Sequence, residues 1–236
     1  MTAPFPQAAY KITAPRLIIR SAVTDDAEAL CRLLSTPENH PFGGAQRNIS
    51  PDIIRGRIER WGPEYASGKK AILMITIRET GELIGCGGFN CFETAEGETC
   101  DVALKRMRDE GYQEGSEEAL GDNFTGEAPR RHTTPYLTDF GVSLDHRYWG
   151  KGYGREVLSG QVDFAVEGLG CSIVRVETEL ENKPWREVMR SMELSELKTK
   201  GPVSYGEKEV GWVYRIDPAT WRDVRGKLEQ RGKWPL

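Results

Sequence analysis

The chain has 236 residues, of which 38% are hydrophobic and 29% are charged. This is the composition of a globular protein with a sizeable core, and without a Pro/Ser-rich linker it predicts a single domain. The formal net charge of -4 gives no overall basic surface, which argues against a dedicated nucleic-acid binder.

Membrane and metal partners are not expected either. No apolar run approaches the ~18 residues that cross a bilayer, and the first six residues lack the pattern of a signal peptide. The three histidines and five cysteines show neither a C-x-x-C pair nor ligand spacing, so we expect no metal, a reduced compartment and a cytoplasmic location. The cysteines are Cys31, Cys86, Cys91, Cys100 and Cys171.

The first part of the chain contains a short apolar segment followed by two segments that begin with helix-capping residues. Residues 1–14 lack periodicity and are predicted to form a loosely docked arm. A strand is expected over 16–20, and a helix from Thr24 to about Ser35. Ser50 and Pro51 begin a second helix, which Gly62-Pro63 is expected to break or kink.

A hairpin and a polar insertion follow. The apolar run 71–78 and the segment 83–92 predict two strands joined by a tight turn. Glycines 85, 87 and 88 suggest a bulge or a close backbone approach rather than a nucleotide loop. Residues 93–134 turn polar, acidic and glycine-rich, which indicates an insertion.

The remaining chain repeats strands and helices. Residues 136–144 alternate like a strand and lead into a glycine-rich turn, after which a helix is expected to end at Gly168. The later elements are a strand over 173–180, a helix over 184–194, a strand over 209–216 and a helix from Pro218.

The glycine-rich turn at 146–156 carries the strongest chemical signal. Three glycines at alternate positions permit positive φ angles and close ligand approach. The turn precedes a helix, so free backbone N–H groups and the positive end of the helix dipole favour an anion there. Arg147 and Lys151 add positive charge, with solvated surface charge as the alternative.

This turn and the order of the elements resemble the GNAT acyltransferase superfamily. Arg147-Tyr148-Trp149-Gly150-Lys151-Gly152 matches its phosphate loop at every fixed place, and the resemblance covers roughly 15–216. The sequence around it is similar to the branch that acetylates ribosomal-protein N-termini and small amines. The resemblance implies an α/β (α+β) fold over 15–236, with a twisted, mostly antiparallel sheet splayed at the acyl-CoA site and flanked by helices.

The same resemblance implies acetyl-CoA as cosubstrate. Its pyrophosphate is expected on the backbone of the turn and its pantetheine beside 140–144, where a bulge frees N–H groups for the thioester carbonyl. The implied contacts are Phe140, Val142, Arg147, Trp149, Gly150, Lys151, Gly152, Tyr153, Gly154 and Asn182.

Acylation needs a neutral amine, so a carboxylate base is expected. Asp139 is the first candidate, and a strand-edge ion pair with a neighbouring arginine is the alternative. Glu177 and Glu179 are further candidates, for which a solvated strand face explains the pattern better. His146 fits either a proton relay or a surface or capping residue.

Some positions depart from the family pattern. Trp185 stands where a small residue is usual, and Glu193-Leu194 replaces Gly-Phe. No tyrosine lies between Asn182 and Leu194 to serve as general acid, which leaves water or Ser191. We predict an N-acetyltransferase, monomeric or homodimeric, that transfers acetyl to a primary amine of a small molecule or protein N-terminus by direct attack; a non-catalytic acyl-CoA-binding module is the alternative.

Overall fold

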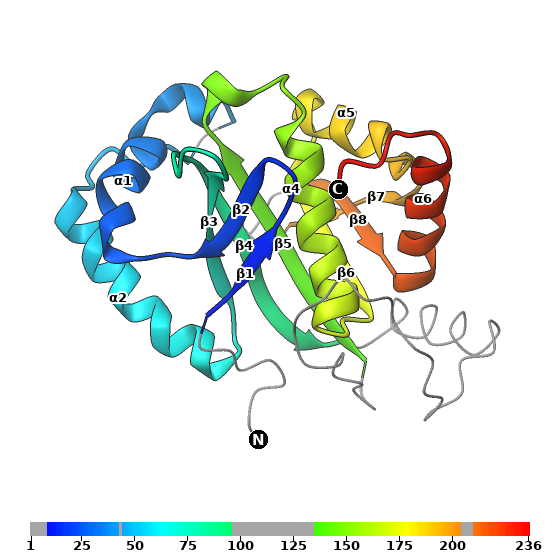
Figure 1. Cartoon of the computed structure of the whole chain (residues 1–236), viewed down its shortest axis with the longest axis horizontal. Helices are drawn as coiled ribbons and strands as arrows, with labels where there is room; N and C mark the ends of the chain where they lie inside the picture. Colours follow the sequence, from blue (N-terminus) through cyan, green and yellow to red (C-terminus); the bar gives the residue numbers. More distant parts are fainter. Residues whose placement is uncertain (1–8, 43, 96–134, 204–209) are drawn as a thin grey trace.

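The computed structural model describes residues 9–42, 44–95, 135–203 and 210–236. Most of the predicted insertion therefore lies outside the described residues. Eight described strands form one sheet in the order β1-β2-β3-β4-β5-β6-β8-β7, drawn in Figure 1. The strands are β1 Lys11–Thr13, β2 Leu17–Ser21, β3 Ala71–Ile77, β4 Leu83–Thr94, β5 Tyr136–Leu144, β6 Ile173–Glu179, β7 Lys198–Pro202 and β8 Val210–Ile216.

The sheet is mixed, and its parallel pair creates a divergence in the middle. β5 and β6 run parallel, and the other strand pairs are antiparallel. Pairing between β5 and β6 ends at Phe140 opposite Val176, although β5 continues to Leu144 and β6 to Glu179. The predicted splayed, mostly antiparallel sheet is confirmed.

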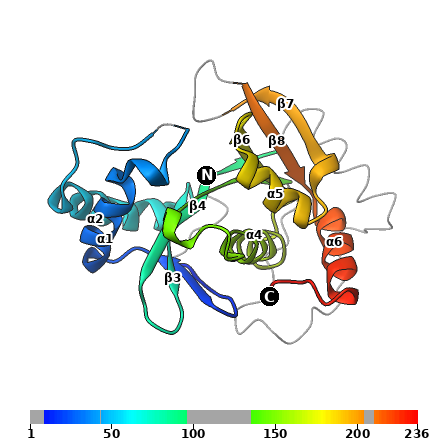
Figure 2. The same cartoon turned by 90° about the horizontal axis from the view of Figure 1, so that it is seen from above.

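Helices cover both faces of the sheet. On one side, α1 (Ala27–Ser35) and α2 (Pro51–Ser67) bury Met74 of β3 in their own apolar cluster. The neighbouring residues of β3, Leu73 and Ile75, point to the opposite face and join the main core, as strand geometry requires. That core also contains α4 (Tyr153–Asp163), α5 (Lys183–Ser191) and α6 (Pro218–Gln230). Figure 2 shows α1 and α2 on the other side of β3 and β4 from α4.

The prediction of a loosely docked arm over 1–14 is wrong for its described end. Residues 11–13 form β1 and pair with β2, while Tyr10, Ile12 and Ala14 are buried. Tyr10 packs against the rings of Tyr65 and Phe164 at about 6 Å. Three residues are too few to show strand periodicity, so only the tertiary contacts reveal this element.

Other boundaries differ from the prediction for local reasons. β4 extends to Thr94 because it pairs with Tyr136 at the start of β5, so the insertion begins later than Glu93. α2 continues through Pro63 to a left-handed Gly68 cap. β7 was not predicted; it is a short edge strand paired with β8.

The bulge predicted from the glycines of segment 83–92 is observed on β4, whereas the bulge that the resemblance implied on β5 is not seen in the pairing of its described residues. Phe89 pairs with Phe140 and Cys91 with Asp139, so Asn90 is the extra residue. The glycines of β4 allow the backbone of a neighbouring strand to approach closely. A Cβ on Gly87 would lie 2.2 Å from the carbonyl oxygen of Gly141. The Asn90 amide lies beside Gly141 on β5, where a Cβ would meet it at 3.1 Å.

Candidate active site

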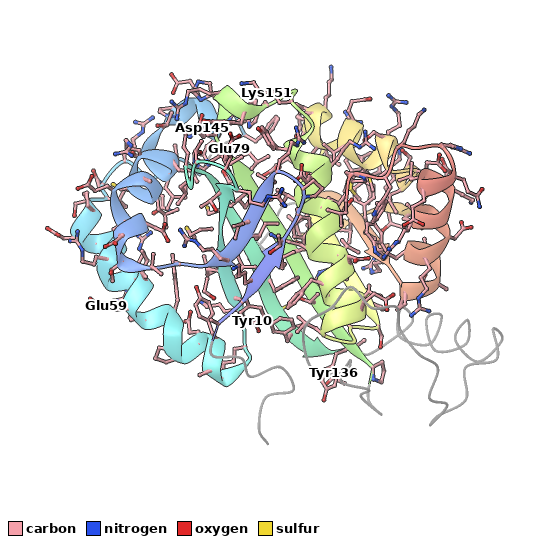
Figure 3. All side chains as sticks on the ribbon, in the orientation of Figure 1. Tyr10, Glu59, Glu79, Tyr136, Asp145 and Lys151 are labelled. Carbon is pink, nitrogen blue, oxygen red and sulfur yellow. The ribbon has the colours of Figure 1, made fainter. Side chains whose placement is uncertain are left out.

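The glycine-rich turn joins the end of β5 to the start of α4, as predicted. Residues 146–148 form a single 3-10 turn, and Gly152 is the N-cap residue of α4. Gly150 and Gly152 have φ angles of 71° and 83°, a region that glycine occupies without strain. Figure 3 shows Lys151 at the top of the molecule, at the opposite end from Tyr136. A helix start with free N–H groups thus lies at the end of β5.

The side chains of the turn are fixed by local contacts. Trp149 is 40% exposed, and its indole nitrogen donates to the carbonyl of Leu144 at 2.8 Å. The Nζ of Lys151 lies 5.2 Å from the centroid of the Tyr148 ring. These contacts hold the aromatic residues on the outside of the turn and leave its backbone to shape the anion site.

Arg147 is paired with Asp145 beside the turn, and its predicted contact with phosphate stays a prediction. Its Nη2 donates to Asp145 Oδ2 at 2.7 Å, and its Nε and backbone N–H donate to Asp145 Oδ1 at 3.0 Å. The hydrogen bond from the Arg147 side chain lowers the pKa of Asp145. In this arrangement Asp145 compensates the Arg147 charge, so the backbone of the turn and Lys151 carry more of the predicted anion site.

A second arginine at the turn was missed. Arg16, between β1 and β2, lies with its guanidinium carbon 4.3 Å from the centroid of the Tyr153 ring and donates from Nη1 to the carbonyl of Lys151 at 3.0 Å. Its backbone N–H and Nε donate to the carboxylate of Glu156 at 2.6 and 2.7 Å. Glu156 is 1% exposed. Because 140 residues separate this pair, no local sequence signal could have found it.

The predicted pantetheine contacts line the divergence of β5 and β6. Phe140 is the last residue of β5 that pairs with β6 and is 1% exposed, while Val142 packs half-buried against the main core. Asn182 is the N-cap of α5, and its Oδ1 accepts from the backbone N–H of Trp185 at 3.1 Å. Gly154 lies in the first turn of α4, against Val188 and Trp185. The structure therefore gathers these residues from β5, α4 and α5, and their contact with a cofactor stays a prediction.

Asp139 lies on the opposite face of β5 from Phe140, in a buried charged cluster. It is 2% exposed, and Arg175, its partner across the parallel pair, places Nη2 3.2 Å from Asp139 Oδ2. The Nε of Arg175 lies 3.1 Å from Glu177 Oε1. Burial alone lowers the pKa of Arg175, but the two carboxylates raise it above its ordinary value. The predicted ion-pair alternative is thus observed, on a central strand instead of a strand edge.

The other predicted acid–base candidates lie in different environments. The Glu177 side chain is 4% exposed, so its prediction as a solvated residue is wrong; Glu179 accepts from the Thr178 hydroxyl at 3.3 Å.

His146 lies beyond the end of β5, and Asp139 to Leu144 alone spans about 16 Å of strand. Its backbone N–H donates to Asn39 Oδ1 at 2.8 Å, so His146 joins the turn to the α1 side and does not relay protons for Asp139. Ser191 donates its hydroxyl to Val188 at 2.7 Å.

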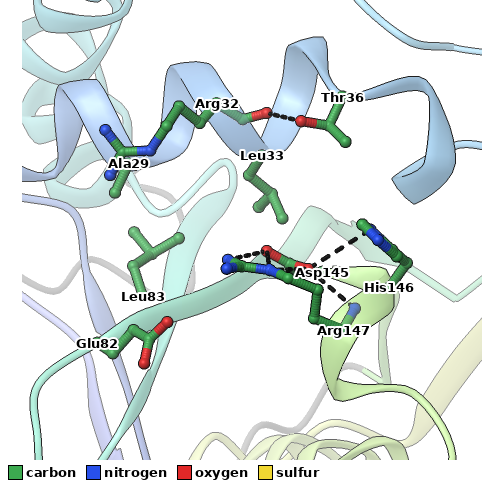
Figure 4. A pocket seen from close by; sticks show the side chains of 9 residues that line it. All are labelled: Ala29, Arg32, Leu33, Thr36, Glu82, Leu83, Asp145, His146 and Arg147. Carbon is green, nitrogen blue, oxygen red and sulfur yellow. Dashed lines mark hydrogen bonds and ion pairs between the residues drawn. The ribbon is translucent and has the colours of Figure 1, made fainter.

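A pocket of about 470 Å³ lies beside the end of β5, between α1 and the β3–β4 turn, and Figure 4 shows Arg147 bound to Asp145 within it. Asp139 is not among its lining residues. The pocket is therefore separate from the charged cluster. It is lined by Ala29, Arg32, Leu33, Thr36, Glu82, Leu83, Asp145, His146 and Arg147.

Cys91 lies opposite Asp139 on β4, beside the charged cluster. Burial, and next the carboxylates of Glu93 and Asp139, raise the pKa of Cys91 to about 12. At neutral pH this thiol is protonated and a poor nucleophile. Among the described residues, no three His, Cys, Asp or Glu side chains group as metal ligands, and no helix combines the length and apolarity of a membrane span.

The comparisons with known proteins agree with this geometry. The model of the acetyltransferase (GNAT) domain matches residues 16–195. A Bacillus licheniformis protein named uncharacterized N-acetyltransferase p20 is 23% identical over 181 residues, which are 75% of this chain and 78% of the relative.

Solved structures show the same fold at low identity. RimJ of Mycobacterium smegmatis in complex with CoA-disulfide is 13% identical with a TM-score of 0.62, covering 99% of this chain and 98% of RimJ. The ribosomal-protein-S5-alanine acetyltransferase of Vibrio fischeri is 12% identical with a TM-score of 0.58, covering 90% and 98%.

The family match spans well over half of the chain, so this protein belongs to the GNAT acetyltransferase family. The predictions of an acetyltransferase and of acetyl-CoA as its cosubstrate are confirmed at the level of the family.

Proposed function

We propose that this protein is an acetyl-CoA-dependent N-acetyltransferase that acetylates a primary amine of a small molecule or of a protein N-terminus. The observation that carries the proposal is the spacing of two features along β5. Its pairing with β6 ends at Phe140. β5 then continues for four more residues to Leu144, and the glycine-rich turn that leads into α4 begins at His146. The thioester at the divergence and the pyrophosphate on the turn would then lie at the two ends of the segment that runs from Phe140 to the glycine-rich turn.

The proposed chemistry is direct attack by the neutral amine on the thioester. Asp139, or a water molecule it holds, removes the proton, and the thiolate of CoA leaves. The protonated state of Cys91 supports a route without an acyl-enzyme, because its pKa of about 12 leaves almost no thiolate at neutral pH. The shared fold of the Vibrio fischeri ribosomal-protein-S5-alanine acetyltransferase supports a protein as one class of acceptor. The reduced cysteines predicted from the sequence support a cytoplasmic location.

The phosphate assignment is tested with Gly150→Glu and Arg147→Glu. A Cβ on Gly150 meets no atom within 4 Å, so the carboxylate of the variant projects from the turn and repels a pyrophosphate. At about 4 Å and surface dielectric this repulsion reaches several kcal/mol, so we expect the affinity for acetyl-CoA, measured by calorimetry, to fall at least about 100-fold. Arg147→Glu should weaken binding less, because Asp145 already compensates Arg147.

Gly232→Glu is the matched control. Gly232, which follows α6, has a φ of 61° and also meets nothing within 4 Å, so the variant carries the same kind of backbone strain and the same added charge outside the glycine-rich turn. Equal acetyl-CoA binding by Gly150→Glu and Gly232→Glu would refute the phosphate assignment. Acetyl-CoA binding without release of free thiol across a panel of amines and N-terminal peptides would favour the non-catalytic alternative.

A further inference from the structure

Trp185 lies where three elements of the proposed cofactor site meet. It is in the first turn of α5, and its backbone N–H donates to the side chain of Asn182 at 3.1 Å. Its ring centroid is 6.1 Å from that of Phe140, with an angle of 44° between the rings. On the other side, its Cζ3 is 3.7 Å from the position of a Cβ on Gly154. The indole therefore reaches from the divergence of β5 and β6 to the first turn of α4.

This position lies along the line that a bound acyl-CoA has to follow. Under the proposed function, the pyrophosphate lies on the turn before α4 and the acyl end reaches the divergence at Phe140. The indole contacts both places from the α5 side. A side chain of this size removes space at the inner end, where the acyl group would extend.

The indole is half-buried, and its inner side packs against the main core. Phe140 is 1% exposed beneath it, and Met189, one helical turn farther along α5, is fully buried. A Cβ on Gly154 would lie 3.3 Å from Val188 Cγ2, so α4 and α5 are already in close contact beside the ring. Close-packed interiors resist added volume because neighbouring side chains have no empty space to enter.

From these contacts we infer that Trp185 is a specificity-determining residue, which restricts the donor to CoA thioesters with a short acyl group such as acetyl. The inference rests on the proposed function and extends it to the acyl chain. Replacing the indole by a small side chain opens space beside Phe140, at the inner end of the site. Longer acyl groups then gain apolar contacts that the wild-type protein denies them.

The test measures binding, so it needs no knowledge of the acceptor amine. Free CoA, acetyl-CoA and butyryl-CoA are titrated by calorimetry into wild-type protein, Trp185→Ala and Trp185→Phe. We expect wild type to prefer acetyl-CoA over butyryl-CoA. In Trp185→Ala, the affinity for butyryl-CoA relative to acetyl-CoA should rise at least about tenfold, because two further methylene groups become buried. Trp185→Phe keeps an aromatic ring and should lie between the two.

Trp234→Ala is the matched control, since Trp234 packs on Trp221 at a centroid distance of 5.4 Å, away from β5. It should leave the butyryl-to-acetyl ratio unchanged. Thermal unfolding shows whether each variant is folded, and Trp185→Phe carries the test if Trp185→Ala is not.

Two results would overturn the inference while the proposed function stands. One is an equal loss of affinity for all three ligands, which would make the indole a support for the pantetheine arm only. The other is an unchanged ratio in a folded variant that binds acetyl-CoA. If wild-type protein binds none of the ligands, the proposed function itself fails, and this inference fails with it.

Discussion

Asp139→Asn separates the two roles of the buried carboxylate at the centre of the sheet. The change keeps the shape of the side chain and removes its charge, which leaves Arg175 paired with Glu177. Breaking a buried ion pair costs about 3–5 kcal/mol when the remaining charge is uncompensated. Because Arg175 keeps one carboxylate and its side chain is 22% exposed, we expect a smaller loss of unfolding free energy, about 2 kcal/mol.

Such a loss leaves a domain of ordinary stability almost fully folded at 25 °C, since unfolding free energies are about 5–15 kcal/mol. A purely structural Asp139 would therefore change the rate very little. A general base contributes roughly 100- to 10,000-fold, and we expect kcat/KM to fall by that factor. The assay is thiol release from acetyl-CoA with the best acceptor of an amine and peptide panel, alongside urea unfolding.

Asp26→Asn is the matched control for this prediction. The Asp26 side chain is 8% exposed, and both of its oxygens accept from Arg20, at 2.7 and 2.8 Å. Its replacement removes this carboxylate from Arg20, so it should cost at least as much stability as Asp139→Asn, and it should leave kcat/KM unchanged. If Asp139→Asn retains kcat/KM within about threefold of Asp26→Asn, the role of Asp139 as base is refuted and the ion pair is its whole function.

Two further predictions concern the ionic contacts of the glycine-rich turn. Glu156→Gln weakens two hydrogen bonds from Arg16, so we expect urea unfolding to show a loss of about 2 kcal/mol, together with weaker acetyl-CoA binding because Arg16 also holds the carbonyl of Lys151. Asp145→Asn should lower the unfolding free energy by about 1 kcal/mol at neutral pH, since the partner side chain is 63% exposed. The hydrogen bond from Arg147 lowers the folded-state pKa of Asp145. This contribution is therefore complete above the unfolded-state pKa of an aspartate, about 3.9, and disappears as the pH falls through the lowered folded-state pKa.

Each of these predictions has a clear counter-result. Glu229→Gln removes an exposed i,i+4 pair with Arg225 and should change stability by less than about 0.5 kcal/mol; an equal loss in Glu156→Gln would show that its burial adds nothing. For Asp145, a stability difference from wild type that persists unchanged at pH 3 would contradict the assigned ionic origin.

Most of the regular elements could be predicted from local patterns. The strand 136–144 and the turn after it were found at their observed positions, because alternation and alternate glycines are signals within a few neighbouring residues. The first helix ends at Ser35 as predicted, before Pro37. These features depend on backbone sterics and on the periodicity of side chains. Both are local properties of the sequence and do not depend on the tertiary structure.

The features that the sequence did not predict depend on contacts between residues distant in sequence. β1 and β7 are short, and each is defined by its pairing with a neighbouring strand. A bulge in segment 83–92 was predicted, but its position at Asn90 depends on the register between β4 and β5, which no window of one strand contains. Pro63 remains inside α2, where packing outweighs the local cost of a proline.

The sequence by itself determined the glycine-rich turn and predicted its phosphate-binding role, since glycines, a helix start and basic residues occur there in one continuous stretch. Only the tertiary structure decided the charges around it: Asp145 takes the Arg147 guanidinium, and Arg16 reaches the turn from 135 residues away. It also decided that Asp139 is paired and that Trp185 covers Phe140. Electrostatic and packing interactions act through space, so the partner of each group depends on how the sheet and helices come together.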